Sequence, residues 1–67
     1  MSITLKAARV NKNLTQTEAA KALKVSVESL RKYETGKSSP NITIVKRMED
    51  LYGVPYSDLI FLSKNTV

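Results

Sequence analysis

Apolar residues recur three or four positions apart along most of the chain, the spacing that places them on one face of an α-helix. The pattern predicts an all-α fold with five helices and no strand. The helices are expected over residues 3–12, 16–23 and 27–34, from Asn41 or Thr43 to Tyr52 just before Gly53, and in a short segment from Pro55. The residues expected to point inward are Leu5, Ala8, Ala19, Ala20, Leu23, Leu30, Tyr33, Ile44, Val45, Met48, Leu51, Leu59, Ile60 and Leu62.

Signals for helix ends divide this pattern. Asn13 tolerates the left-handed conformation that closes a helix, so the first helix is expected to end there. Thr15 is a good N-cap, and Glu18 three residues later completes a capping box. Ser26 caps the third helix. Residues 14–37 thus contain two short helices separated by a tight turn, the layout of a helix-turn-helix, whose second helix enters the major groove of DNA.

The charge is unevenly distributed along the chain, whose net charge is +5. Residues 1–40 hold eight Lys or Arg and three Glu, whereas residues 41–67 hold three charges of each sign. A basic half that contains the two short helices fits a surface that attracts phosphates. Solvated lysines that keep a small protein soluble would give the same composition, and charge alone leaves both interpretations open.

The missing residue types exclude several kinds of chemistry. The chain has no Cys, which excludes disulfides and thiolate metal sites, and no His, the commonest metal ligand and general base. A nucleophile and its base would have to come from surface Lys, Glu and Ser in a domain too small for a pocket. We therefore expect no enzyme, no cofactor, no metal and no small-molecule ligand.

The length of the chain fits a single domain over residues 1–67, with residues 63–67 as a frayed tail. A chain this short buries only about 60% of the surface that its unfolded form exposes. Its longest apolar stretch is far below the ~18 residues of a membrane span, and its first residues lack the pattern of a secretory signal. We expect a cytoplasmic protein that does not bind membranes.

A set of residues spread over most of the chain matches one known family. The match is carried by Leu14, Thr15, Gln16, Glu18, Ala20, Val25, Ser26, Leu30, Tyr33, Glu34, Gly36, Lys37, Pro40, Gly53, Val54, Asp58 and Leu59. From about residue 5 to residue 61 the chain resembles the phage Cro and repressor-type helix-turn-helix family, also called the XRE family. The resemblance implies a compact five-helix, lambda-repressor-like domain that binds DNA in a bacterial or phage-infected cell.

Two residues depart from the family pattern. Lys24 stands in the turn where the family usually has Gly. A left-handed Lys24 would be strained by about 1 kcal/mol, and its side chain would offer a phosphate contact in return. Ala19 stands where a larger aliphatic residue is common, so we expect thinner packing between the first two helices.

The resemblance implies that the N-terminal end of the third helix points into the major groove. Val27 would then contact a thymine methyl group, Glu28 would accept a hydrogen bond from cytosine N4, and Lys32 would donate to guanine O6 and N7. Arg31 points outward and reaches either a base or a phosphate. The alternative for Glu28 and Lys32 is an ordinary i,i+4 ion pair, which is worth about 0.2–0.5 kcal/mol.

Contacts with the sugar-phosphate backbone are expected around this helix. Gln16 resembles the family's glutamine at the start of the second helix, where a side-chain amide and the positive helix end meet a phosphate. The alternative is a glutamine that only faces solvent. The other residues expected to contact phosphates are Lys6, Lys24, Ser26, Ser29, Thr35 and Lys37.

Two further groups of residues are expected to act outside the DNA contact. The resemblance implies that Arg9 and Glu34 form a partly buried ion pair, which ties the first helix to the end of the third. The neutral half of the chain is more apolar and aromatic than its packing requires, which indicates a dimer interface, although the same side chains would also complete a thin core. The candidates for this interface are Tyr52, Pro55, Tyr56 and Phe61.

Together these features predict a sequence-specific regulator of transcription that binds double-stranded DNA. A single domain of this kind reads a short site, so we expect a homodimer, formed in solution or only on DNA, on a pseudo-palindromic operator. The protein would act by occupancy, as a Cro-like repressor. The alternatives are a protein-interaction module of the antitoxin or adaptor type with the same fold and, ranked last, a basic amphipathic membrane binder.

Overall fold

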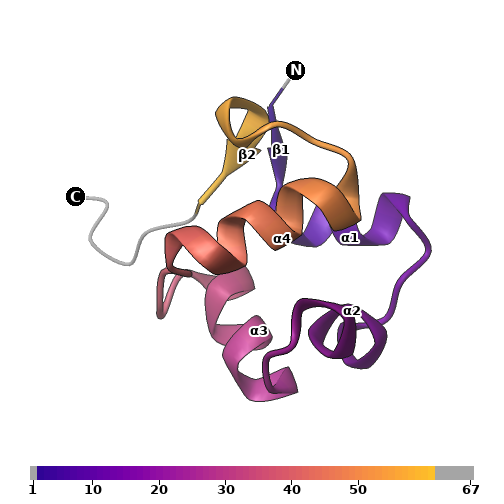
Figure 1. The fold of residues 1–67 in the computed structure, drawn as a ribbon, viewed down its shortest axis with the longest axis vertical. Coiled ribbons are helices and arrows are strands. Elements are labelled where there is room, and N and C mark those ends of the chain that lie inside the picture. The colour runs from indigo at the N-terminus through magenta and orange to yellow at the C-terminus, as the bar shows by residue number, and fades with distance from the viewer. Residues whose placement is uncertain (1, 62–67) are drawn as a thin grey trace.

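The computed structural model describes residues 2–61, and this part of the chain is mainly helical, as predicted (Figure 1). In chain order the elements are β1 (Ile3–Thr4), α1 (Leu5–Asn11), α2 (Gln16–Leu23), α3 (Val27–Thr35), α4 (Ile42–Tyr52), the 3-10 helix η1 (Tyr56–Asp58) and β2 (Leu59–Ile60). The predicted limits of the second helix are confirmed, and the third helix is one residue longer than expected. Leu62 and the tail expected over residues 63–67 lie outside the described residues.

The ends of α2 and α3 follow the local signals in the sequence. Thr15 Oγ1 accepts a hydrogen bond from the Glu18 backbone N–H at 3.1 Å, and Glu18 Oε1 accepts from the Thr15 N–H at 2.9 Å, which completes the predicted capping box. Ser26 Oγ caps α3 by accepting from the Ser29 N–H at 3.0 Å. These side chains satisfy amide groups that a helix terminus otherwise leaves without a partner.

α4 begins after Asn41, one of the two start positions predicted for it. Asn41 is the N-cap, since its Oδ1 accepts from the Ile44 N–H at 2.9 Å. The helix ends at Gly53, which is left-handed with a φ of 68°. In between, Arg47 Nη1 donates to the Leu23 carbonyl at 3.1 Å and so ties α4 to the last turn of α2. This bond satisfies a carbonyl at the C-terminal end of α2.

The fifth helix expected from Pro55 is wrong, and so is the expectation of no strand. A single 3-10 turn, Tyr56–Asp58, is followed by β2, which runs parallel to β1 and pairs Ile3 with Leu59. The first helix accordingly begins at Leu5, because the two residues before it belong to β1. Pairing between segments so distant in the sequence leaves no local periodicity, and a two-residue strand is too short to show alternation.

The core lies among the four α-helices and consists mostly of residues predicted to point inward. Its buried side chains are Leu5, Ala8, Ala19, Ala20, Leu23, Leu30, Ile44, Val45, Met48, Tyr52 and Leu59. Tyr33 and Leu51 are half-buried against this cluster. Ile60, which was expected to be inward, is 40% exposed.

The elements are arranged in three levels along the molecule (Figure 1). α2 and α3 lie at one end, β1 and β2 lie at the other, and α1 and α4 lie between them. Within residues 2–61, none of the helices combines the length and the apolar composition needed to cross a bilayer. The fold thus separates the helix-turn-helix from the strand pair that closes the domain.

Candidate nucleic-acid interface

The residues expected to contact DNA lie on α1, at the start of α2, in the turn before α3, and on α3 with the loop after it. The exposed members of this set are Lys6, Lys24, Ser26, Glu28, Arg31, Lys32, Thr35 and Lys37. Gln16, Val27 and Ser29 are half-buried. Glu28 is the one acid among the exposed members, so the surface that these residues provide is polar and basic, as contact with phosphates requires.

An ion pair on α3 involves two of the side chains expected to meet base edges. Arg31 Nη1 donates to Glu28 Oε1 at 3.2 Å, and the two side chains are 56% and 64% exposed. The structure therefore pairs Glu28 with Arg31 at i,i+3, and not with Lys32 as the i,i+4 alternative had it. A pair this exposed is worth less than about 1 kcal/mol, so both side chains are free to exchange it for other partners.

Hydroxyl groups at the two ends of α3 are engaged within the protein. Ser26 Oγ accepts from the Ser29 N–H and donates to Ser29 Oγ at 2.9 Å, while Thr35 Oγ1 donates to the Arg31 carbonyl at 2.9 Å. A hydroxyl has a single hydrogen to donate, so Ser26 and Thr35 would have to exchange a bond to reach a phosphate. The Ser29 hydroxyl hydrogen is not used in this arrangement.

The turn between the two short helices is closed by Lys24. This residue is left-handed, with φ 62° and ψ 40°, in the position where the family usually has Gly. The Lys24 N–H donates to the Lys21 carbonyl at 3.2 Å, and the Val25 N–H donates to the Ala20 carbonyl at 3.0 Å. The backbone bonds close the helix while the strained residue keeps an exposed ammonium group in the turn.

Arg9 and Glu34 form a buried ion pair between α1 and the end of α3. Arg9 Nε donates to Glu34 Oε2 at 2.7 Å, and Arg9 Nη2 donates to Glu34 Oε1 at 3.3 Å. The two side chains are 10% and 3% exposed. Arg9 Nη1 also donates to the Leu14 carbonyl at 2.8 Å. A buried charge pair is tolerated when its hydrogen bonds are satisfied in this way, and removal of one partner is costly.

Gln16 has a partner that no sequence pattern indicated. Its Nε2 donates to Glu34 Oε1 at 3.0 Å, so the amide at the start of α2 is bonded to the ion pair behind it. The side chain is half-buried. Gln16 is therefore not a residue that only faces solvent, and its orientation depends on a residue at the far end of the helix-turn-helix.

Tyr52 was expected at a dimer interface, and this is wrong. The residue is 2% exposed and belongs to the core, because its position on the last turn of α4 places the ring against the other helices. Its hydroxyl is buried, and no group within the described residues forms a hydrogen bond with it. Burial, and secondly the negative charge of Glu34, raises the pKa of Tyr52 from 10.0 to about 12, against the opposing charge of Arg9.

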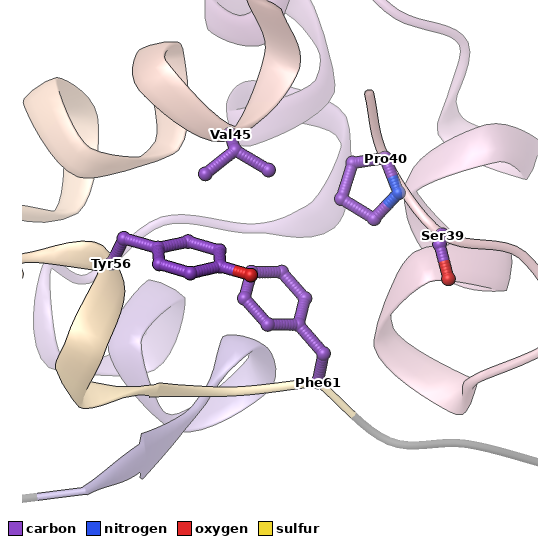
Figure 2. A pocket seen from close by; sticks show the side chains of 5 residues that line it. All are labelled: Ser39, Pro40, Val45, Tyr56 and Phe61. Atoms are coloured by element: carbon purple, nitrogen blue, oxygen red, sulfur yellow. The ribbon is translucent and has the colours of Figure 1, made fainter. Parts of the chain in front are cut away.

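Two of the remaining interface candidates, Tyr56 and Phe61, line a hollow of about 170 Å³ (Figure 2). Pro55 and Tyr56 are exposed, Phe61 is half-buried, and the rings of Tyr56 and Phe61 are 5.5 Å apart. Figure 2 shows both rings on the side of the hollow that faces Val45 and Pro40. The hollow is lined by Ser39, Pro40, Val45, Tyr56 and Phe61.

Sequence reasoning missed two parts of this region. Ile42 and Ile60 are 66% and 40% exposed, and they add to the apolar surface of the C-terminal half. Glu49 Oε2 accepts from the Tyr56 backbone N–H at 2.6 Å and fixes the segment after α4. The exposure of Ile42 at the first position of α4 follows from the cap at Asn41, but the Glu49 contact has no local signal.

Comparison with known proteins adds two findings. A model of the helix-turn-helix family matches residues 5–59, from the start of α1 to β2. Over 59 residues, 88% of this chain, the sequence is 32% identical to the cryptic phage CTXphi transcriptional repressor RstR of Vibrio cholerae. The matched part is 53% of that protein, so the chain spans about half the length of this curated relative.

Proposed function

The chain belongs to the helix-turn-helix family of phage Cro and repressor type, the XRE family, and on that premise we propose that it regulates transcription by binding double-stranded DNA in a sequence-specific manner. The observation that carries this proposal is the capped α2–turn–α3 unit, on which Glu28, Arg31 and Lys32 are exposed along α3. Base recognition in the major groove needs polar side chains on a rigid helix.

Recognition of bases falls to α3. Lys32 donates to guanine O6 and N7, and the exposed part of Val27 contacts a thymine methyl group. The Glu28–Arg31 pair opens in the groove, so that Glu28 accepts from cytosine N4 and Arg31 donates to a base or a phosphate. A glutamate that does not find a cytosine is left among phosphates, and it therefore acts against wrong sequences.

Affinity comes from the phosphates. Gln16, Ser29 and the lysines at positions 6, 24 and 37 are assigned to the sugar-phosphate backbone of the DNA, together with Ser26 and Thr35. If six phosphates are neutralised, the slope of log K against log salt concentration is about −5. A steep fall of affinity with salt concentration, equal for all DNA sequences, would identify the phosphate contribution.

We assign the apolar surface of the C-terminal half to a second copy of the chain. Tyr56 and Phe61 line the hollow, Ile60 is a further exposed apolar residue of this half, and residues 41–67 carry no net charge. A two-fold dimer through this surface would present two α3 helices to half-sites one DNA turn apart, ~34 Å. Pro55, which is exposed and precedes Tyr56, is assigned to the same contact. A dimer on a pseudo-palindromic operator would repress by blocking access to the DNA, and the similarity to a transcriptional repressor supports this outcome.

Selection of duplexes from a randomised DNA pool at roughly physiological salt tests the proposal, because non-specific phosphate binding is weakened there. We expect recovery of an inverted repeat whose half-site centres lie about one DNA turn apart. Recovery of single half-sites would retain DNA binding and overturn the dimer. No enrichment with a folded protein would overturn DNA binding and favour a module that binds another protein.

A further inference from the structure

We infer that Glu34 is a positioning residue for DNA binding: its carboxylate holds the Gln16 amide in the orientation in which that amide meets a phosphate. The inference rests on the proposed function, because it needs a phosphate at the start of α2. It assigns Glu34 a task beyond its ion pair with Arg9.

Both oxygens of the Glu34 carboxylate accept hydrogen bonds. Oε2 accepts from Arg9 Nε at 2.7 Å, and Oε1 accepts both from Arg9 Nη2 at 3.3 Å and from Gln16 Nε2 at 3.0 Å. The Glu34 side chain is 3% exposed, whereas Gln16 is half-buried. The carboxylate is therefore fixed from behind by Arg9, and it presents one oxygen toward the surface at the start of α2.

The Arg9 charge makes this arrangement compatible with a phosphate. A bare carboxylate close to DNA would repel it, but the bidentate guanidinium neutralises Glu34 within the protein. Arg9 is in turn held by the Leu14 carbonyl, two residues before Gln16. The ion pair thus acts as an uncharged acceptor for Gln16, anchored to the segment that leads into α2.

The Gln16 amide has one hydrogen left to donate to a phosphate. Nε2 carries two hydrogens, and the bond to Glu34 uses one of them. The other hydrogen is left to donate from a nitrogen whose position is already set. Ordering a free side chain at an interface lowers affinity by about two- to tenfold, so a glutamine held in advance saves a factor of this size.

The positioning is tested first in the free protein, without DNA. Gln16 is the only glutamine in the sequence, so its side-chain amide signals are assigned by residue type, and the exposed Asn13 provides a matched amide control. The {1H}–15N NOE of the Gln16 Nε2 group should be that of a rigid group, well above the Asn13 value. Equal mobility of the two amides would overturn the inference, whatever the protein does with DNA.

Two double variants then separate positioning from the ion pair. Arg9→Met/Glu34→Gln removes the pair and keeps an acceptor oxygen for Gln16, whereas Arg9→Met/Glu34→Met removes both. Replacing both partners avoids an orphaned charge, and circular dichroism checks that each variant is folded. In the first variant the Gln16 amide should stay rigid, and in the second it should become as mobile as Asn13. Because Glu34→Gln adds a second glutamine, the Gln16 signals of the first variant are identified by their loss when Gln16→Ala is added to it.

DNA affinity supplies the functional readout. Gln16→Ala should raise the Kd for a short duplex about two- to tenfold in the wild type and in Arg9→Met/Glu34→Gln, but less than about twofold in Arg9→Met/Glu34→Met. An equal effect in all three backgrounds would show that Glu34 is only structural. Failure of the wild type to bind any duplex would overturn the proposed function and this role together, while a rigid Gln16 amide would still record the hydrogen bond.

Discussion

The α2–turn–α3 unit and the segment from α4 to β2 differ in the contacts that fix them and in the side chains that they expose. In the first, each helix begins at a side-chain cap three residues away and ends at a left-handed residue, and the exposed residues are mostly charged or polar. In the second, the chain end is fixed by distant contacts, from Glu49 to the Tyr56 N–H and from β1 to β2, and large apolar side chains remain exposed.

The two surfaces therefore suit different partners. Charged side chains on a rigid helix favour a polyanion, because they stay solvated when free and release counterions when bound. Exposed Tyr56 and Ile60 gain nothing from phosphates, and they favour an apolar protein surface. The buried Arg9–Glu34 pair lies behind the first surface and joins it to α1.

The largest effect is expected from breaking that pair on one side only. Glu34→Ala or Arg9→Ala should lower the free energy of unfolding by about 3–5 kcal/mol, since either change leaves a buried charge without its partner. Urea denaturation followed by circular dichroism measures the loss. Glu28→Ala, at the exposed pair on α3, is the matched control and should cost less than about 1 kcal/mol. Equal costs at the two pairs would contradict the burial argument.

The next effect separates the second surface from the first. Tyr56→Ser should weaken binding to a palindromic operator by about 100-fold and leave binding to a single half-site unchanged, because the gain from linking two modules is lost. Val10→Ser provides the control, since Val10 is also exposed (52%) but lies on α1. Gel-shift titrations on both duplexes measure the ratio. A Tyr56→Ser protein that binds the palindrome normally would place the dimer contact elsewhere.

Within the first surface, Lys32 and the peripheral lysines should behave differently. Lys32→Ala should remove about 1–3 kcal/mol of discrimination at one base pair per half-site. Lys6→Ala and Lys37→Ala should weaken binding to all sequences alike and make the salt slope shallower by about 0.9 each. Competition titrations with single-base variants distinguish the two patterns. A uniform loss in Lys32→Ala would mean that the groove register is wrong.

A smaller effect is expected in the turn. Lys24→Gly should raise the free energy of unfolding by about 0.5–1 kcal/mol, because glycine adopts the left-handed conformation without steric strain. The same change should reduce DNA affinity through the loss of an ammonium group. Gly36→Ala is the opposite test, since Gly36 is left-handed with a φ of 83°, and it should be destabilising. Stability and affinity that move together in Lys24→Gly would contradict this account of the turn.

The smallest effect at neutral pH is expected at Tyr52. Tyr52→Phe should leave stability unchanged or raise it by up to about 1 kcal/mol, because it removes a buried hydroxyl that has no hydrogen-bond partner in the described structure. Urea denaturation at neutral pH checks this. A loss of several kcal/mol would indicate a partner for the hydroxyl.

At alkaline pH the Tyr52 hydroxyl should affect stability through the loss of its proton. The pKa of Tyr52 is about 12 in the folded protein and 10.0 in the reference state, so the unfolded chain releases its proton first. The stability linked to this proton is complete below about pH 10 and is lost toward pH 12 by about 1.4 kcal/mol per pH unit. The wild type should therefore lose stability faster than Tyr52→Phe in this range.

The two regions also differ in how well the sequence predicts them. The limits of α2 and its capping box follow from Thr15 and Glu18, because a cap depends on residues three positions apart. The fold of residues 56–60 does not follow, because β2 exists only through its pairing with β1 at the other end of the chain. Local periodicity alone predicts a fifth helix there.

The candidate site shows the same division. The family resemblance predicts the pair of Arg9 and Glu34. The hydrogen bond from Gln16 to Glu34 links the start of α2 to the end of α3, and no local sequence pattern indicates it. The expectation for Tyr52 rested on its aromatic character, although its position four residues after Met48 places it on the inward face of α4. Side-chain partners across elements are set by packing, which periodicity does not encode.

An NMR titration of the 15N-labelled protein with a short duplex tests the division of surfaces most directly. We expect the amide shifts to change around Gln16, in the turn and along α3 to Lys37, and those of residues 56–61 to change only on a duplex with two half-sites. Changes centred on residues 56–61 with a single half-site, or none along α3, would contradict this division.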